Sequence, residues 1–308
     1  MSYEMNRRTL LRYAGQAGGV MAAGGALELL LAACGGNVST TTGSTPTAGA
    51  VTVPSKGLKI PGLLQWGADY VSGAPYVFQN PNNPGQLIGF EVEIAVAIAK
   101  LMNIQQKQIE VCYSNLEQAL AANQIDMVMN GWEKTPDREK TELFSEPYYR
   151  YGQQIIVRKD DPRFANITNP TSIKVLEGYT VGTGAGYLAQ TIMQSDPKIK
   201  IKAYAGNIAF SDLVQGKVDA FFLDFPIAAY YVLGSGPGAT PIPQLKLLGQ
   251  PIYPDNYYVG FNKSNPNAQL LLPEINQCFD ILKKNGTLKK IYMKWQMWNS
   301  QQAEIGIM

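Results

Sequence analysis

The 308-residue chain is 45% hydrophobic and 16% charged, which is long and apolar enough for two domains with buried cores and excludes disorder for most of its length. Its formal net charge of +2, without dense basic clusters, argues against nucleic-acid binding. The chain has no histidine, which excludes His-based catalytic triads and His metal sites, and we expect neither a cofactor nor a metal.

The first 33 residues are typical of an export signal, which is a targeting sequence and not part of the folded domain. Residues 6–12, NRRTLLR, resemble a twin-arginine signal, and a small, apolar stretch from 14 to 33 follows them. A membrane-spanning helix is the alternative, but Glu28 and several glycines make this stretch a poor span.

Residues 31–35, LAACG, resemble a lipobox, whose cysteine, here Cys34, is acylated and becomes the mature amino terminus. Several acyl chains on one cysteine anchor a protein firmly. We therefore expect an exported protein, lipid-anchored at the outer face of the cell membrane, on its periplasmic or extracellular side. Residues 34–57 are rich in Ser, Thr, Pro and Gly, which predicts a flexible linker.

Two cysteines remain once Cys34 is assigned to lipid. Cys112 and Cys278 both lie in apolar surroundings in the sequence, so we expect buried free thiols. A disulfide between them is the alternative for an exported protein.

The folded part is expected to begin with a strand at 63–67 and a helix from residue 89 with a core-facing apolar side. Side chains alternate along residues 109–113 as in a half-buried strand, and Asn115 can cap the helix that follows. The short apolar run at 127–129 predicts a buried strand.

Asn130 and Gly131 follow that run, and Arg138 lies just past a proline. Glycine lets a ligand approach bare backbone, and arginine offers a planar fork that suits a carboxylate. Because ligands bind at the carboxyl ends of strands in open α/β sheets, this stretch is the first candidate for a binding site.

Residues 120–131 and 213–224 follow one pattern of helix end, polar turn, branched aliphatic residue, Asp, apolar strand and polar tip. This internal repeat predicts two similar α/β lobes, each presenting a strand tip to one cleft. It makes Gly131 and Asp224 counterparts. Asp224 lies at a strand-to-helix turn, where capping the helix is the alternative role.

A glycine turn at 182–186 is expected to join a strand to a helix start, whose exposed amides would suit an anion. The spacing of its glycines fits neither phosphate-loop pattern, so we do not expect a nucleotide site.

Four motifs carry a resemblance to a known family. They are GFEVEIA at 89–95, GWEKTPDR at 131–138, FSEPYY at 144–149 and GTLKKIYMKW at 286–295. In this order they resemble the type 2 solute-binding proteins of ABC importers, and more narrowly the polar amino acid group, bacterial solute-binding protein family 3. The resemblance covers nearly everything after residue 60.

The resemblance implies an α/β fold of two lobes, each a mixed sheet flanked by helices, joined by two crossing strands near residues 153–157 and 253–261. Lobe 1 would comprise residues 58–157 and 251–308, and lobe 2 would comprise residues 158–250.

It also implies a function. The chain would be the substrate-binding lipoprotein of an ABC importer, a monomer that captures a polar amino acid between its lobes and delivers it to a membrane permease and its ATPase. No catalytic residues are expected. An enzyme of the cyclohexadienyl or arogenate dehydratase type and a ligand-sensing lipoprotein are the alternatives.

The implied site divides the ligand between the lobes. Arg138 and the Gly131 amide would hold the ligand's carboxylate, and Asp224 would hold its ammonium group. Tyr113 stands where the family packs an aromatic residue over the ligand's side chain, although a half-buried strand residue is an equal interpretation.

The loop after the first strand is one residue longer than in the family, which leaves Tyr70 and Tyr76 as alternative aromatic partners. The other candidate ligand-binding residues are Asp69, Asn130, Trp132, Glu133, Gly186, Tyr187 and Leu188.

Glu133 departs from the family pattern, which usually has Ser or Thr at this position. A carboxylate here would repel a ligand carboxylate unless it turns away, pairs with Lys134 or Arg138, or meets a positive group on the ligand. We expect Glu133 to line the cleft and to favour a ligand with an extra cation or amide. A solvated turn is the alternative.

Overall fold

The computed structural model describes residues 52–308. The expected export signal, the lipidation site at Cys34 and the linker up to residue 51 lie outside the described residues. Among residues 52–308, no helix combines the length and apolar character needed to cross a membrane.

In lobe 1, strand β1 (Leu63–Ala68) lies between β4 (Gln105–Glu110) and β5 (Met127–Glu133), and both neighbours run parallel to it. All seven residues of β5 are buried, as is typical of a strand covered on both faces. The expected strands at 63–67 and 127–129 are confirmed. The second strand continues to Glu133, so the candidate residues Asn130, Gly131, Trp132 and Glu133 belong to it.

Lobe 2 repeats this arrangement. Strand β8 (Thr180–Gly184) lies between β9 (Lys200–Tyr204) and β10 (Ala220–Asp224), again with parallel neighbours. The residues of β10 are buried throughout, and the strand ends on Asp224. The three-strand parallel unit therefore occurs twice, in agreement with the internal repeat.

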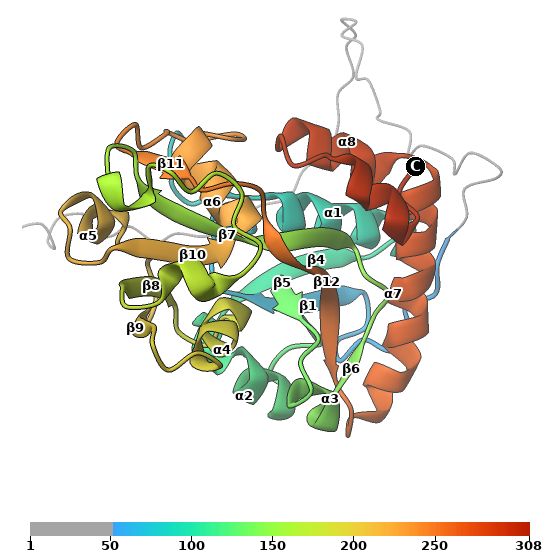
Figure 1. Ribbon diagram of the computed structural model, residues 1–308. Helices are drawn as coiled ribbons and strands as arrows, with labels where there is room; N and C mark the ends of the chain where they lie inside the picture. Colours follow the sequence, from blue (N-terminus) through green and yellow to red (C-terminus); the bar gives the residue numbers. More distant parts are fainter. Residues whose placement is uncertain (1–51) are drawn as a thin grey trace, which may run out of the picture. The chain divides into compact units, whose positions relative to one another are not determined.

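Two long strands connect the lobes. Strands β7 (Tyr149–Arg158) and β12 (Ile252–Asn262) pair antiparallel with each other, while β12 also pairs with β5 and β7 with β10. The hydrogen-bonded order is β4-β1-β5-β12-β7-β10-β8-β9 (Figure 1). The register between β7 and β12 shifts between Ile252 and Asp255, so the ladder is irregular where the chain passes between lobes. The two-lobed fold with two crossing strands is confirmed.

Short strands complete the sheets. The additional pairs are β6 (Glu142–Phe144) with β12, β11 (Leu245–Leu247) with β7, and β2 (Phe78–Gln79) with β3 (Leu87–Ile88).

Helices cover the sheet faces. In lobe 1, α1 (Phe90–Met102), α7 (Pro266–Lys284) and α8 (Thr287–Lys294) pack against one another (Figure 1). The shorter helices are α2 (Leu116–Ala121), α3 (Arg138–Thr141), α4 (Leu188–Gln194), α5 (Phe210–Val214) and α6 (Phe225–Ala228). A π-helical turn follows at Ala229–Leu233, and 3-10 turns occur at Tyr113–Asn115, Pro162–Phe164, Ile173–Leu176 and Ser300–Ile305.

Helix α7 begins at Pro266. Proline suits the first helical position, and the Asn265 side chain accepts a hydrogen bond from the Asn267 amide at 3.0 Å. The helix then runs through Pro273, an interior proline that argues against a helix when only the sequence is read.

The end of the expected linker belongs to the fold. Val53 is buried, and its amide donates to the Leu101 carbonyl at 2.9 Å. The amides of Lys56 and Gly57 donate to the Glu274 carboxylate at 2.8 and 3.3 Å. Residues 53–57 are therefore held against α1 and α7 by backbone bonds that their composition does not reveal.

The segment around Tyr113 also differs from expectation. Strand β4 ends at Glu110, and Tyr113 begins a 3-10 turn instead of continuing the strand. Asn115 precedes α2, but its side chain makes no capping hydrogen bond within the described residues, because its own backbone is already helical.

The two cysteines of residues 52–308 are free. Cys278 is buried on α7, as expected, and burial raises the pKa of its thiol to about 12. Cys112 is exposed, because it lies on the loop after β4 and not in a strand. The expectation of burial is wrong for Cys112.

Candidate functional site

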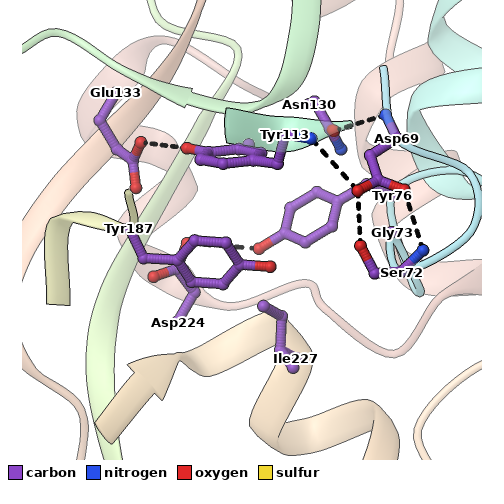
Figure 2. A pocket seen from close by; sticks show the side chains of 11 residues that line it. Asp69, Ser72, Gly73, Tyr76, Tyr113, Asn130, Glu133, Tyr187, Asp224 and Ile227 are labelled. Atoms are coloured by element: carbon purple, nitrogen blue, oxygen red, sulfur yellow. Dashed lines mark hydrogen bonds between the residues drawn. The ribbon is translucent and has the colours of Figure 1, made fainter. Parts of the chain in front are cut away.

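A small pocket lies where the two lobes meet. The tips of β5 and β10 contribute to it, together with the loops after β1 and β8 (Figure 2). Its lining residues are Asp69, Ser72, Gly73, Tyr76, Tyr113, Asn130, Gly131, Glu133, Tyr187, Asp224 and Ile227.

The pocket brings together most of the residues proposed from the sequence. The proposed residues that line it are Asp69, Tyr76, Tyr113, Asn130, Gly131, Glu133, Tyr187 and Asp224. Those that do not line it are Tyr70, Trp132, Arg138, Gly186 and Leu188. Ser72, Gly73 and Ile227 line it without having been proposed, because their place depends on how the lobes meet.

Asp69 organises one wall through its own backbone neighbours. Its Oδ1 accepts from the amides of Val71 and Ser72 at 3.0 Å, and its Oδ2 accepts from Ser72 Oγ at 2.7 Å and from the Tyr113 amide at 3.2 Å. Asx turns of this kind fix a loop. Asp69 therefore shapes the pocket with a carboxylate whose two oxygens already accept hydrogen bonds.

Tyr76 lies inside the pocket, whereas Tyr70 lines a separate groove with Phe78 and Tyr230. The Tyr76 hydroxyl is 2.7 Å from the Tyr257 hydroxyl. Of the two alternatives that the longer loop left open, the structure places Tyr76 among the candidate site residues.

Asp224 reaches the pocket from the tip of β10. Its Oδ2 accepts from the Tyr257 hydroxyl at 2.6 Å and lies 3.4 Å from the Tyr76 hydroxyl, and its Oδ1 accepts from Gln153 Nε2 at 2.8 Å. Burial, with a further contribution from the negative charge of Glu133, raises the pKa of Asp224 to about 8. Within the described residues its side chain makes no helix-capping bond, so it is an acceptor facing the pocket.

Tyr257 and Gln153 come from the crossing strands β12 and β7. Asp224 belongs to lobe 2 and Tyr76 to lobe 1. One carboxylate thus contacts both lobes and both connections between them. Nothing in the sequence marks Tyr257 or Gln153 beyond their place in the crossing strands.

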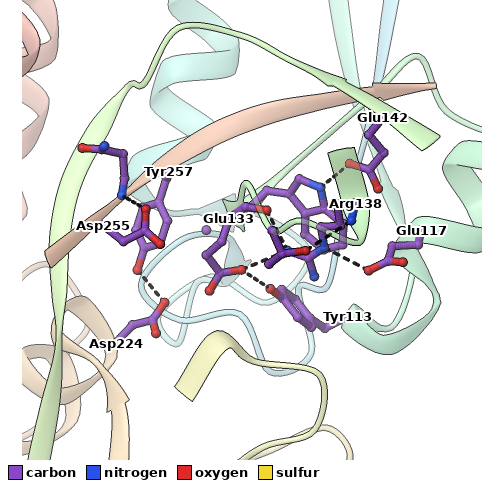
Figure 3. A network of polar contacts seen from close by, with 12 residues as sticks. Tyr113, Glu117, Glu133, Arg138, Glu142, Asp224, Asp255 and Tyr257 are labelled. Carbon is purple, nitrogen blue, oxygen red and sulfur yellow. Dashed lines mark hydrogen bonds and ion pairs between the residues drawn. The ribbon is translucent and has the colours of Figure 1, made fainter. Parts of the chain in front are cut away.

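Glu133 is held by a buried ion pair (Figure 3). Its Oε2 accepts from Arg138 Nη1 at 3.0 Å and from the Tyr113 hydroxyl at 2.9 Å. Arg138 Nη1 also donates to the Glu133 carbonyl, and Arg138 Nε donates to Glu117 Oε1 at 2.9 Å. Lys134 pairs instead with Glu139 at 2.8 Å.

Arg138 lies behind Glu133 and against Trp132. Its guanidinium carbon is 3.4 Å from the centre of the Trp132 ring, within the range of a cation–π contact. The side chain is 6% exposed and contacts the pocket wall through Glu133. Arg138 and Asp224 therefore approach the same pocket from opposite lobes, with Glu133 between Arg138 and the open space.

The Gly131 amide, expected to be free for a ligand carboxylate, is already engaged. It donates to Glu91 Oε1 at 2.7 Å, and the Tyr148 hydroxyl donates to the same oxygen. Burial raises the pKa of Glu91 to about 8. The sequence does not mark Glu91, because its neighbours on α1 form an ordinary apolar face and its contact with Gly131 depends on tertiary packing.

The expected anion site at the start of α4 is engaged as well. The Gly186 amide donates to Gln190 Oε1 at 2.8 Å, and the Tyr187 amide donates to the Gly184 carbonyl at 3.3 Å. Local hydrogen bonds thus replace the exposed amides that the glycine turn suggests.

Two tyrosine rings meet across the pocket. Tyr113 from lobe 1 and Tyr187 from lobe 2 have ring centres 4.9 Å apart and planes at 63°. Aromatic pairs favour this edge-to-face arrangement. Residues 52–308 contain no group of three or more Cys, Asp or Glu side chains placed to hold a metal ion.

Comparison with known proteins agrees with this geometry. Residues 67–297 match the family model of bacterial extracellular solute-binding proteins, family 3. The chain is similar to the probable amino-acid-binding protein YxeM of Bacillus subtilis (strain 168), with 32% identity over 73% of this chain and 81% of the relative. It is also similar to the arginine-binding periplasmic protein of Mannheimia haemolytica, with 31% identity over 71% of this chain and 86% of the relative.

Among solved structures, the chain is similar to the ancestral amino acid-binding protein AncCDT-1, described as a precursor of cyclohexadienyl dehydratase. The TM-score is 0.65 and the identity 29%, over 76% of this chain and 95% of that structure.

Proposed function

We propose that this chain, which belongs to the bacterial extracellular solute-binding proteins, family 3, captures a polar amino acid between its lobes and delivers it to the permease of an ABC importer. The similar proteins of Bacillus subtilis and Mannheimia haemolytica support this proposal, because their names assign amino acid and arginine binding to them. Family membership implies export and a partnership with permease and ATPase subunits.

One observation carries the proposal. Asp224 of lobe 2 and Glu133 of lobe 1 line the same pocket, and Arg138 pairs with Glu133 behind the pocket wall. A free amino acid has one negative and one positive group, so it can bridge an arginine on one lobe and an acid on the other. Such a ligand stabilises the closed arrangement because it contacts both lobes.

In this proposal Asp224 holds the ligand's ammonium group, and Arg138 holds its carboxylate after Glu133 Oε2 gives up its bond to Nη1. Charge-assisted hydrogen bonds contribute about 1.5–3 kcal/mol each, so three or four together contribute about 4.5–12 kcal/mol, a range that includes the roughly 8 kcal/mol of a micromolar receptor before ordering costs.

Glu133 adds a preference among amino acids. The ionisable side chains of Asp, Glu, Lys or Arg type among the residues that line the pocket are Asp69, Glu133 and Asp224, all of them acids that carry negative charge when ionised. A second cation on the ligand would offset this negative charge, and an amide could donate hydrogen bonds to it. We therefore propose a ligand with an extra cation or amide in its side chain.

Lipid anchoring through Cys34 and a monomeric state complete the proposal. Replacing Cys34 with Ala should release the exported protein from the membrane fraction, and light scattering should give the mass of one chain. An anchored Cys34→Ala variant would exclude the lipobox.

Ligand binding can be tested with a thermal-shift panel of amino acids and polyamines, on protein that has been unfolded and refolded to remove carried-over ligand. A bound ligand raises the apparent melting temperature by mass action. Calorimetry should then show loss of binding in Arg138→Ala and Asp224→Ala and a changed ligand ranking in Glu133→Ser. A panel without any response would exclude the proposal.

Dehydratase activity is the second candidate function, favoured by the likeness to AncCDT-1 and by the three buried acids at the pocket. Product formation from prephenate or arogenate over an hour would support it. Binding without turnover would support the function of a solute receptor.

A ligand-sensing lipoprotein is the remaining alternative. It would bind the same solutes without supporting their uptake in cells.

A further inference from the structure

The Tyr187 ring packs on the backbone of Gly184. The residue follows β8 and precedes α4, and a Cβ atom added to Gly184 would lie 2.5 Å from the Tyr187 ring. The ring therefore lies directly over glycine backbone at the end of the strand. The position of the Tyr187 ring is therefore fixed by this contact, unlike that of a tyrosine on an exposed loop.

The ring faces its counterpart from the other lobe. Tyr113 and Tyr187 both line the pocket, both are half-buried, and their ring centres are 4.9 Å apart (Figure 2). Tyr187 belongs to lobe 2 and Tyr113 to lobe 1. A ligand group that enters between the rings must separate them, and closure of the lobes brings both faces onto that group.

A carboxylate lies at the edge of this pair. The Tyr113 hydroxyl donates to Glu133 Oε2 at 2.9 Å, and Glu133 lines the same pocket. Two aromatic rings that meet edge to face, with a carboxylate beside one of them, suit a planar, delocalised cation, which can stack on a ring while its N–H groups point at the carboxylate. An ammonium group has no plane to stack.

We propose that Tyr187 is a specificity-determining residue, whose ring closes on a planar side-chain group of the ligand against Tyr113 and favours a guanidinium or ureido group over an ammonium group. This inference rests on the proposed function, since it assigns a side-chain class to the amino acid bound there. It gives Tyr187 and Glu133 separate tasks. Tyr187 selects a planar group, and Glu133 selects a positive one.

Three amino acids of similar length separate these tasks. L-arginine is planar and charged at its end, L-citrulline is planar and neutral, and L-lysine is charged without a planar group. Their dissociation constants are to be measured by calorimetry with refolded protein of the wild type, Tyr187→Ala and Tyr187→Phe. Tyr179→Ala is the matched control, because Tyr179 is a half-buried tyrosine at the opposite end of β8.

The wild type should bind arginine most tightly. Tyr187→Ala should weaken arginine and citrulline by about tenfold, which corresponds to about 1.4 kcal/mol, and should change lysine by less than about threefold. Tyr187→Phe should bind as the wild type does, because the ring remains. Gly184→Ala, which displaces the ring without removing it, should reproduce the pattern of Tyr187→Ala if both variants keep the wild-type melting temperature.

Equal losses for arginine and lysine would overturn the assignment of Tyr187, as would a wild type that prefers lysine. Those results would leave amino acid binding intact. A wild type that binds none of the three amino acids and no other member of the panel would instead overturn the proposed function, and this inference with it.

Discussion

Glu133 and Arg138 form an ion pair at the pocket wall, with 3.0 Å between Glu133 Oε2 and Arg138 Nη1 and side-chain exposures of only 2% and 6%. Charges buried to this degree depend on each other, because removal of one leaves the other without compensation. The pair therefore links the stability of lobe 1 to the chemistry of the pocket.

Replacing Arg138 with Met should lower the free energy of unfolding by about 3–5 kcal/mol, because the Glu133 charge is then buried alone. Adding Glu133→Gln to that variant should recover part of the loss. Urea unfolding of both variants measures this coupling. The exposed pair Lys140–Asp137 supplies the control, and Lys140→Met should leave the urea midpoint unchanged. Equal effects in Arg138→Met and Lys140→Met would contradict the account.

Two buried acids predict how stability depends on pH. Burial raises the pKa values of Glu91 and Asp224 to about 8, from ordinary values of 4.5 and 3.8. Between these limits the folded chain binds more protons than the unfolded chain, so the stability that these acids contribute is full below about pH 4 and is lost as pH rises towards about 8.

The urea midpoint of ligand-free protein should therefore fall between about pH 5 and pH 8, and Glu91→Gln should reduce the fall. Glu139→Gln, at an exposed salt bridge, should leave the slope as in the wild type. A wild-type midpoint that stays level or rises between about pH 5 and pH 8 would contradict the raised pKa values of these two carboxyl groups.

Gly131 is required for two separate reasons. Its φ is +59°, which disfavours other residues, and an added Cβ would lie 2.8 Å from the Tyr76 ring. Gly62 has a φ of +79° with open space around it. Gly62→Ala should cost about 1 kcal/mol of stability for backbone strain alone.

Gly131→Ala should cost more than Gly62→Ala and should also weaken ligand binding, because it displaces Tyr76 in the pocket. Chemical unfolding and calorimetry measure the two effects. If both variants lost the same free energy of unfolding and Gly131→Ala kept the wild-type ligand affinity, the Tyr76 ring would have space to shift away from the added methyl group.

Part of the candidate site could be predicted from the sequence. The residues that could be predicted belong to local sequence patterns, and those that could not depend on tertiary contacts. The position of Asp224 at the pocket can be predicted because a local repeat makes it the counterpart of Gly131, and such a repeat can be recognised without knowledge of the tertiary structure. Tyr257 and Gln153 could not be found, because they contact Asp224 only after two distant strands pair.

The state of a hydrogen-bonding group was harder to predict than its position. The Gly131 amide lies at the pocket, as expected, but it already donates a hydrogen bond to Glu91. Arg138 is expected to face the ligand, but it lies behind Glu133, and Glu133 and Glu117 accept hydrogen bonds from its guanidinium group. Such partners come from side chains 5–40 positions away, whose direction depends on packing.

The carboxyl terminus holds a crossing strand in place. Gln302 is fully buried, its Nε2 donates to the Arg150 carbonyl at 2.7 Å, and its Oε1 accepts from the Arg150 amide at 2.9 Å. Gln302 thus pairs with β7 as a neighbouring strand would.

Gln302→Leu should lower the free energy of unfolding by about 2–3 kcal/mol, because two buried backbone groups lose their partners. Exposed Gln301 provides the control, and Gln301→Leu should change stability by less than about 0.5 kcal/mol. Urea unfolding distinguishes them, and indistinguishable curves would argue that water replaces the lost partner.

The central claim is that a small zwitterion bridges the two lobes through Asp224. The most direct test is a calorimetric titration of refolded wild type and Asp224→Ala with the amino acid that gives the largest thermal shift. The account predicts micromolar binding by the wild type and a loss of about 30-fold or more in the variant, the equivalent of one charge-assisted hydrogen bond. Equal affinity in the two proteins would contradict it.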